Sequence, residues 1–429
     1  MPLSFRNIYN HHMVIQQNKP IPVAGYGTDG QTVTVTLGDS TATATVANGV
    51  WAVELPAMQG GFTPYTLTAK TAAEQVELTD ILVGEVWIFT GQSNPAYQID
   101  QIVNLELRQA VIDHAQDEWV RSVTTCHCEA PNEYGDFTAP ATWVKGTDDT
   151  MRQGAIGIAF AKCLRDALNV PVGVVTAAWG GSFITQWTGE GGSDFVYRHT
   201  AKCWTGLHYA ALVWYQGESD QGASLNPNYA RRFGDLRERF FTDFIDGEMN
   251  MFVVQLPNHQ TEDWAQRGWV KIRAAQESFM DTYDRLTTVC TIDMGEKDNI
   301  HPDDKLSFAK RIAGSALNVH YGDKRFGAVS PRMKAVFATD GGWTVEFDTE
   351  APLALTEGDT TVFGLELESA DGTRTPTTGR ITGDHTMVVD AVDGVEATHI
   401  LYLQNNYNPA VNLFDENGLP VFPFAATIE

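Results

Sequence analysis

The chain has 429 residues, and at roughly 150 residues per domain this length predicts two or three domains. Hydrophobic residues make up 43% of the sequence and charged residues 19%, which permits large cores and excludes a disordered chain. The 29 Lys and Arg residues against 54 Asp and Glu residues give a net charge of −25, which argues against nucleic acid or an anionic membrane surface as a partner.

Residues 1–80 predict an N-terminal β domain. Polar and apolar side chains alternate in residues 32–37 and again in residues 42–46, with the period of a half-buried strand. Turns that contain Gly and Asp separate these strands at 27–30 and 38–39. We therefore expect a small antiparallel domain of the sandwich type.

Residues 81–325 predict an α/β domain with a parallel sheet. Continuous apolar strands that alternate with amphipathic helices are typical of a parallel sheet covered on both faces. In such a fold, the site lies beyond the carboxyl ends of the strands. We expect strands at 86–89, 172–177, 211–215, 251–255 and 287–292, and helices at 100–116, 153–168, 227–245, 265–283 and 303–319.

Residues 326–429 predict a C-terminal β domain. Alternation returns at 343–347 and at 387–389, and turns at 340–342 and 371–372 separate the strands. No apolar run in the chain approaches the roughly 20 residues that span a bilayer. The first residues lack the basic and apolar regions of a signal peptide, so we expect a cytoplasmic protein.

The five cysteines favour free thiols, because an odd and sparse number in a long chain is typical of a reducing compartment. Cys126, His127 and Cys128 resemble half of a metal site. No second Cys/His pair follows at the spacing of a zinc site, so we expect no metal there.

Four polar motifs follow four of the predicted strands. Ser93 lies at a strand-to-helix turn, where a serine is exposed and can act as a nucleophile. Gly181 lies in a glycine turn that leaves backbone N–H groups open to an oxyanion. Gln216 can donate to the same oxyanion through its side-chain amide. His301 can take a proton from the serine, and Asp298 can hold its imidazole in the required tautomer.

Each motif has a plainer interpretation when it is taken alone. Ser93 can be a helix N-cap, the glycines an ordinary turn, and Asp298 a cap beside a surface His301. Glu218, two residues after Gln216, can orient a neighbour or cap the next turn. The four motifs occur in order and each follows its own strand, which favours a serine hydrolase.

These motifs resemble those of the SGNH (GDSL-like) hydrolase superfamily, and within it the sialate O-acetylesterase group of carbohydrate esterases. The resemblance implies a three-layer α/β/α domain with a parallel sheet, flanked by N- and C-terminal β domains. The stretches that carry it lie at 91–94, 179–181, 214–219 and 300–302, with further similarity at 13–17, 49–51, 83–87, 253–256, 273–276, 412–414 and 418–424.

The resemblance also implies the role of each residue. Ser93 would attack the acetyl carbonyl, and His301, oriented by Asp298, would act as base and then as acid. The N–H groups of Ser93 and Gly181 and the amide of Gln216 would form the oxyanion hole. An acetyl-enzyme would form and be hydrolysed, with no cofactor and no metal.

Three departures from the family pattern keep alternatives open. Pro95 and Ala96 stand where the family has Met and often an acidic residue, which predicts a different sugar preference. Asn299 stands where many bacterial relatives have an Asp two residues before the histidine, so a Ser–His dyad or Glu296 are alternatives to Asp298. The stretch 187–208 is short for the family, which predicts a more open pocket or one completed by a partner subunit in a homo-oligomer.

Aromatic and polar residues in the later loops are candidates for contact with the sugar, because aromatic rings can stack on sugar faces. Packing in the core is an equally good interpretation for each of them. The candidates are Trp179, Trp187, Trp204, His259, Trp264, Trp269, Arg273 and Gln276.

The favoured function is an acetylesterase acting on acetylated mono- or oligosaccharides, with sialic acid and plant or host glycans as options. A general short-chain esterase or deacylase and a non-catalytic carbohydrate-binding protein are the alternatives. A glycosidase that uses Glu218 and Asp220 is disfavoured, because two residues this close in one loop do not by themselves flank a glycosidic bond.

Overall fold

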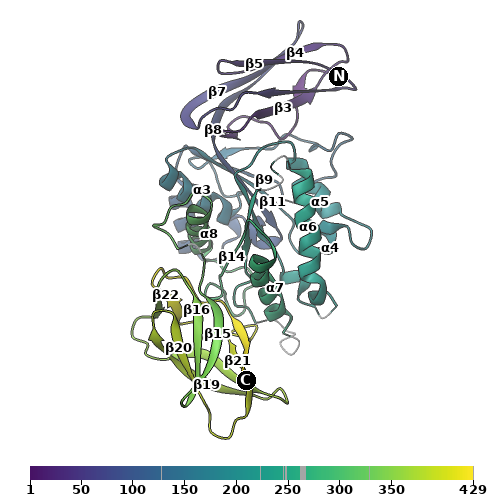
Figure 1. Cartoon of the computed structure of the whole chain (residues 1–429). Coiled ribbons are helices and arrows are strands. Elements are labelled where there is room, and N and C mark those ends of the chain that lie inside the picture. Colours follow the sequence, from purple (N-terminus) through teal and green to yellow (C-terminus); the bar gives the residue numbers. More distant parts are fainter. Residues whose placement is uncertain are drawn as a thin grey trace. The chain divides into compact units, whose positions relative to one another are not determined.

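The structure is a computed structural model that describes residues 1–126, 128–222, 224–244, 246, 249–260, 267–327 and 329–428 (Figure 1). The fold is a mixed α/β fold with large sheets, as predicted. The chain forms two compact units. The first consists of Met1–Gln216, Arg231–Met251 and Asp303–Lys310, and the second of Gly217–Ala230, Phe252–Pro302 and Arg311–Glu429.

Burial alternates along strand β4 (Thr32–Leu37) of the first unit, as the alternation of polar and apolar residues in the sequence predicts. In this strand, Val33, Val35 and Leu37 are buried while the intervening threonines are not. β4 pairs with β5 and with β7, and β3 pairs with both β1 and β6, all antiparallel. The other strands of this region are β1 (Ser4–Phe5), β2 (Val14–Gln16), β3 (Ile21–Tyr26), β5 (Ser40–Thr45), β6 (Val50–Leu55) and β7 (Gly61–Lys70).

Strand β8 (Gln75–Gly91) is 17 residues long and takes part in two kinds of pairing. Up to Val83 it pairs antiparallel with β7, and from Glu85 onward it pairs parallel with β11. Its side chains are exposed or half-buried through residue 80, and all are buried from Ile81 onward. The boundary predicted between residues 80 and 81 therefore falls inside a continuous strand, at the point where its burial changes.

The parallel strands of the first unit lie in the order β9, β11, β8, β12, and β10 is added antiparallel at the edge. The predicted strands at 172–177 and 211–215 correspond to β11 (Val172–Ala178) and β12 (Ala211–Tyr215). β9 (Val120–Thr124) was not predicted, because Arg121 and Ser122 interrupt its apolar pattern. Both are buried, and Arg121 pairs with Asp80 at 3.3 Å.

Helices cover these strands. α3 (Ala155–Leu168) packs on β9 and β11, and in Figure 1 it lies on the opposite side of these strands from α5 and α6. The predicted helices are found within about two to five residues of their expected starts. The remaining elements are α1 (Ser93–Ala96), η1 (Ile99–Gln101), α2 (Leu105–Ala115), β10 (Val144–Lys145), α4 (Thr185–Thr188), α5 (Phe195–His199), η2 (Ala201–Trp204), α6 (Tyr229–Asp243) and α8 (Lys305–Val319).

The second unit joins a smaller α/β part to a β-rich part. Its α/β part holds the last three residues of β13 (Asn250–Val254), β14 (Leu286–Val289), α7 (Gly268–Thr282), η3 (Glu218–Gln221) and η4 (Asn226–Asn228). The β-rich part has a seven-stranded antiparallel sheet in the order β15, β16, β20, β19, β18, β21, β23. Its strands are β15 (Arg332–Thr339), β16 (Gly342–Asp348), β18 (Val362–Ser369), β19 (Arg374–Gly383), β20 (Thr386–Asp390), β21 (Ala397–Tyr402) and β23 (Phe424–Thr427), and β17 (Leu353–Leu355) pairs with β22 (Leu413–Asp415).

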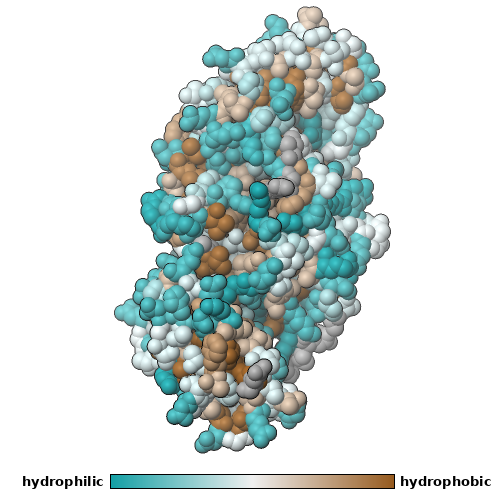
Figure 2. Space-filling model, in the orientation of Figure 1, coloured by the Kyte–Doolittle hydropathy of each residue, from teal (hydrophilic) through white to brown (hydrophobic). Residues whose placement is uncertain are grey.

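Hydrophilic residues predominate on the face shown in Figure 2, where hydrophobic residues form small separate patches. Large apolar side chains that remain exposed, such as Val103, Leu105 and Phe337, are few among the described residues. No helix in the described ranges is long and apolar enough to cross a bilayer.

Candidate active site

Three neighbouring strands of the first unit, β11, β8 and β12, end in register at one edge of the sheet. In the parallel register, Gly91 at the end of β8 is opposite Ala178 at the end of β11 and Tyr215 at the end of β12. Neighbouring strands lie about 4.8 Å apart. The segments that follow these strands, which carry Ser93, Gly181 and Gln216, therefore start side by side at one edge of the sheet.

Gly91 permits the turn into the serine. Its φ is +130°, and a Cβ there would lie 2.0 Å from the Tyr215 carbonyl oxygen, so no other residue fits without moving the backbone. The chain is held by two backbone hydrogen bonds, from Gln92 to Tyr215 at 3.0 Å and from Trp179 to Gly91 at 2.9 Å. Ser93 then begins helix α1 and is half-buried, which is the strand–turn–helix context that a nucleophilic serine needs.

Lys305 makes a buried polar contact with Asn94, the residue that follows Ser93. The Lys305 ammonium donates to Asn94 Oδ1 at 2.8 Å and lies 4.6 Å from the centre of the Tyr97 ring. Lys305 has no exposed surface and Asn94 is 1% exposed. Asn94 lies in the sequence motif at 91–94, but neither residue was predicted to have a role in the site. The available signal was a lysine on the apolar stripe of helix α8, at the three- and four-residue spacing from the buried Phe308 and Ala309.

The glycine loop and Gln216 are joined by a hydrogen bond. Gly181 is exposed and has a φ of +69°, which favours glycine. Gln216 is fully buried, and its Nε2 donates to the Ser182 carbonyl at 3.1 Å. This bond fixes the plane of the amide beside the loop, and the nitrogen carries a second N–H in that plane.

Two predicted sugar-binding tryptophans lie near this loop in different surroundings. Trp179 is half-buried, with its ring 5.5 Å from Phe195 and perpendicular to it. Trp187 is fully buried, packs edge-on against Trp214, and donates to Ser182 Oγ at 2.9 Å. Trp187 therefore supports the loop from the core and has no exposed face for a sugar. Trp204 is also fully buried and donates to Thr125.

The histidine motif belongs to the second unit. His301 is half-buried, and its backbone N–H donates to Asn299 Oδ1 at 3.0 Å. Asn299 Nδ2 in turn donates to Glu296 Oε2 at 3.1 Å, so Asn299 links Glu296 to His301. Asp298 is exposed, and no hydrogen bond or ion pair within the described part of the chain joins it to His301.

Other predicted residues of the second unit are largely structural. Arg273 is 1% exposed and donates to the Asn405 carbonyl and to Asn258, and burial lowers the pKa of its guanidinium to about 9. Its side chain ties parts of this unit together and does not face solvent. His259 is half-buried against the Trp269 ring at 5.2 Å, and burial lowers the pKa of its imidazole.

The remaining candidates within the described residues are buried. Glu218 and Asp220 are buried in η3, Gln276 accepts from the Leu256 N–H, and Trp269 is 1% exposed. Trp264 lies outside the described residues.

The Cys126–His127–Cys128 motif is described only in part, because His127 lies outside the described residues. Burial raises the pKa of the Cys126 thiol to about 12 and that of Cys128 to about 11, so both are protonated near neutral pH. All five cysteines are free thiols. Within the described ranges, no three His, Cys, Asp or Glu side chains are placed to hold a metal.

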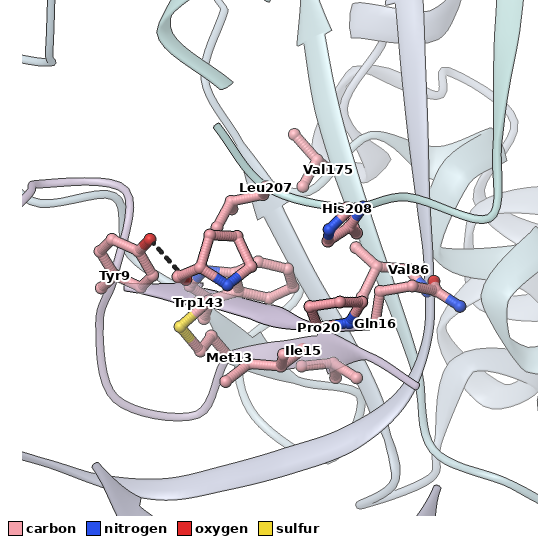
Figure 3. Close-up of a pocket in the computed structure, with 12 residues that line it drawn as sticks. Tyr9, Met13, Ile15, Gln16, Pro20, Val86, Trp143, Val175, Leu207 and His208 are labelled. Atoms are coloured by element: carbon pink, nitrogen blue, oxygen red, sulfur yellow. Dashed lines mark hydrogen bonds between the residues drawn. The ribbon is translucent and has the colours of Figure 1, made fainter. Parts of the chain in front are cut away.

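One apolar pocket of the first unit is too small to hold a sugar. Figure 3 shows it between the N-terminal strands and the sheet, with Met13, Ile15 and Val86 among its lining residues. Its volume of about 10 Å³ holds roughly one water molecule. The residues at the strand ends remain the candidate site.

Comparisons with known proteins show the family of the chain. A sequence model of the family "Carbohydrate esterase, sialic acid-specific acetylesterase" matches residues 83–318, more than half of the chain. Human sialate O-acetylesterase is 26% identical over 377 residues, covering 75% of this chain and 71% of that protein. The mouse sialate O-acetylesterase is 25% identical and covers 83% of this chain and 81% of its own length.

A solved structure resembles the whole chain. The carbohydrate acetylesterase from Xanthomonas citri gives a TM-score of 0.90 at 26% identity and covers 100% of both chains. The chain therefore belongs to the carbohydrate esterase family of sialic acid-specific acetylesterases and is a carboxylic ester hydrolase.

Proposed function

We propose that this acetylesterase removes O-acetyl groups from sugars by a serine mechanism, with Ser93 as the nucleophile. The observation that carries the proposal is the common register of β8, β11 and β12, which brings Ser93, Gly181 and Gln216 to one edge of the sheet. A nucleophile and its oxyanion donors have to surround one carbonyl group, and segments that start side by side support such an arrangement.

The proposed reaction has two halves. Ser93 Oγ attacks the acetyl carbonyl carbon while His301 takes the hydroxyl proton, and the carbonyl oxygen becomes an oxyanion. The N–H groups of Ser93 and Gly181 and the Gln216 amide donate to that oxyanion. The C–O bond to the sugar then breaks, and His301 returns the proton to the leaving hydroxyl. In the second half, water loses a proton to His301 and attacks the acetyl-serine, and acetate leaves.

We also propose the SGNH-type α/β/α layering for residues 81–325, with β domains formed by residues 1–80 before it and residues 326–429 after it in the sequence. The packing of α3 on β9 and β11 supports this layering. The change in burial along β8 at Ile81 supports the first boundary.

The exposed position of Asp298 favours a Ser93–His301 pair over a full triad. We expect Asp298→Asn to lower kcat by less than about tenfold, while His301→Ala lowers it by about 10³ or more. Initial rates on p-nitrophenyl acetate measure both effects. A loss of about 10⁴ in kcat for Asp298→Asn is typical when the carboxylate of a triad is removed, and it would show instead that Asp298 orients the imidazole.

The experiment that tests the proposal is acetate release from p-nitrophenyl acetate and from acetylated mono- and oligosaccharides. Wild type is compared with Ser93→Ala, and Ser224→Ala serves as the matched control. We expect Ser93→Ala to lose several orders of magnitude in kcat on every ester while its circular dichroism spectrum is unchanged. Equal activity of Ser93→Ala and wild type would refute the role of Ser93. Equal rates on acetyl and longer acyl esters would favour the general deacylase.

A further inference from the structure

A groove lined by both polar and apolar residues lies beside the candidate site, at the carboxyl end of β9. Its volume is about 700 Å³, within the range of roughly 300–1,000 Å³ that is usual for ligand sites. Its walls come from three segments of the first unit: the turn after α1, the stretch after β9, and the residues before α3. Its polar lining residues include Gln98, Thr124, Glu129, Asp149, Arg152 and Gln153.

Two independent observations place the groove close to Ser93. Thr124 at the end of β9 is opposite Thr176 of β11, which is opposite Phe89 of β8. Two strand spacings place the end of β9 roughly 10 Å from β8. Gly154, next to Gln153, also packs closely on the turn that follows the serine, since a Cβ on Gly154 would lie 2.9 Å from the Pro95 carbonyl oxygen.

Gln153 presents a fixed donor to this groove. It is 94% buried, and its Oε1 accepts from the Thr124 hydroxyl at 3.1 Å. Among the described residues, no hydrogen bond uses its Nε2, and Gln153 is one of the residues that line the groove. A buried amide held by its oxygen in the wall of a groove is suited to hold a hydroxyl group through its nitrogen.

The charges of the groove select against an anionic ligand. Glu129 and Asp149 are anionic, and Arg152 is the cation among the described lining residues. The guanidinium of Arg152 is already 3.2 Å from an Asp100 carboxylate oxygen and 3.5 Å from Gln98 Oε1. The carboxylate of a sialic acid would find no uncompensated positive charge here, whereas neutral hydroxyl groups would find both donors and acceptors.

We infer that this groove binds neutral sugar units next to the acetylated one, so that the preferred substrate is an acetylated neutral oligosaccharide. The inference rests on the proposed function, because it takes Ser93 as the point where the acetyl group is removed. The chemistry of recognition is hydrogen bonding to hydroxyl groups by Gln153, Arg152 and Gln98.

The test compares kcat/KM on an acetylated neutral trisaccharide with kcat/KM on the acetylated monosaccharide. Wild type should prefer the trisaccharide. Gln153→Glu keeps the bond to Thr124 but removes the donor, and Arg152→Ala removes the guanidinium. Each should lower the trisaccharide-to-monosaccharide ratio about tenfold, as one lost hydrogen bond predicts. Arg231→Ala, an exposed arginine of the same unit, is the control that leaves the ratio unchanged.

Two outcomes of the kinetic comparison would overturn the inference: a wild type that does not prefer the trisaccharide, or variants that keep the wild-type ratio. Calorimetric titration of Ser93→Ala with the deacetylated trisaccharide tests the groove without turnover. Binding that Gln153→Glu weakens supports the groove even if Ser93 proves not to be the nucleophile. The absence of binding refutes the groove even if the esterase proposal holds.

Discussion

Lys305 shows how a single residue can prepare the candidate site without touching substrate. A buried ammonium is costly unless it is hydrogen-bonded, and Lys305 is bonded to Asn94, the residue after Ser93. The contact ties helix α8 to helix α1 at the residue that follows Ser93. We regard Lys305 as a positioning residue.

Replacing Lys305 with Met keeps the length of the side chain and removes its charge. Asn94 Oδ1 would then lose a charged donor, so we expect kcat to fall at least tenfold, with KM within about twofold of wild type, because a hydrogen bond to a charged group contributes about 1.5–3 kcal/mol. Steady-state kinetics on p-nitrophenyl acetate measure this. Lys310→Met, on the exposed face of the same helix, is the control. An unchanged kcat in a folded Lys305→Met enzyme would show that Lys305 does not position the site.

The residues that the sequence identified and those that it missed differ in how local their signal is. Ser93, Gly181 and Gln216 each follow an apolar strand directly, so their position could be predicted from neighbouring residues. The burial of Trp187 and Arg273 depends on distant partners such as Trp214 and Asn405, which spacing along the chain does not reveal.

At the scale of elements, the pairing of α2 with α3 contains a titratable contact. His114 on α2 lies 3.2 Å from the Ala159 carbonyl of α3 and 3.5 Å from Cys163 Sγ. Burial lowers the pKa of His114 below its ordinary value of 6.5. The unfolded chain therefore takes up this proton first as the pH falls, and the stability that neutral His114 gives is lost as the pH drops below about 6.5 toward the folded pKa.

We expect the difference in thermal midpoint between wild type and His114→Gln to change with pH. The midpoint of wild type relative to the variant should fall between pH ~7.5 and pH ~5.5, because only wild type carries the titrating imidazole. Calorimetric scans at both pH values provide the measurement. A pH-independent difference for His114→Gln would contradict the assignment.

Element types were predictable where the apolar pattern was continuous. β12 was predicted with its observed bounds and α3 within two residues, since both bury nearly every position of the pattern. β9 was missed because its buried Arg121 is neutralised by Asp80, a residue 41 positions away. The unbroken course of β8 was missed for a related reason, since its two halves face different surroundings.

At the scale of the whole molecule, the net charge of −25 acts on any charged substrate. Repulsion of an anionic sugar ester is strong at low ionic strength, where the screening length is about 30 Å at 0.01 M salt, and weak near 1 M, where it is about 3 Å. The charge therefore acts in the same direction as the groove, favouring neutral sugars.

A cytoplasmic location of the protein remains a proposal.

We expect added salt to raise kcat/KM for O-acetylated sialic acid by at least threefold between about 0.01 M and 0.5 M NaCl. For an acetylated neutral sugar of similar size, the change should stay within about 1.5-fold, and this substrate is the internal control. Rates of acetate release at a series of salt concentrations measure the two slopes. Equal slopes would show that the net charge does not act on substrate encounter.

The proposed passage of the acetyl group through Ser93 is tested most directly by peptide mass mapping after the enzyme is mixed with p-nitrophenyl acetate and quenched in acid. We expect the added mass of one acetyl group on the peptide that contains Ser93, with none on that peptide in Ser93→Ala. An acetyl group found on another residue, with turnover intact, would show that Ser93 is not the nucleophile.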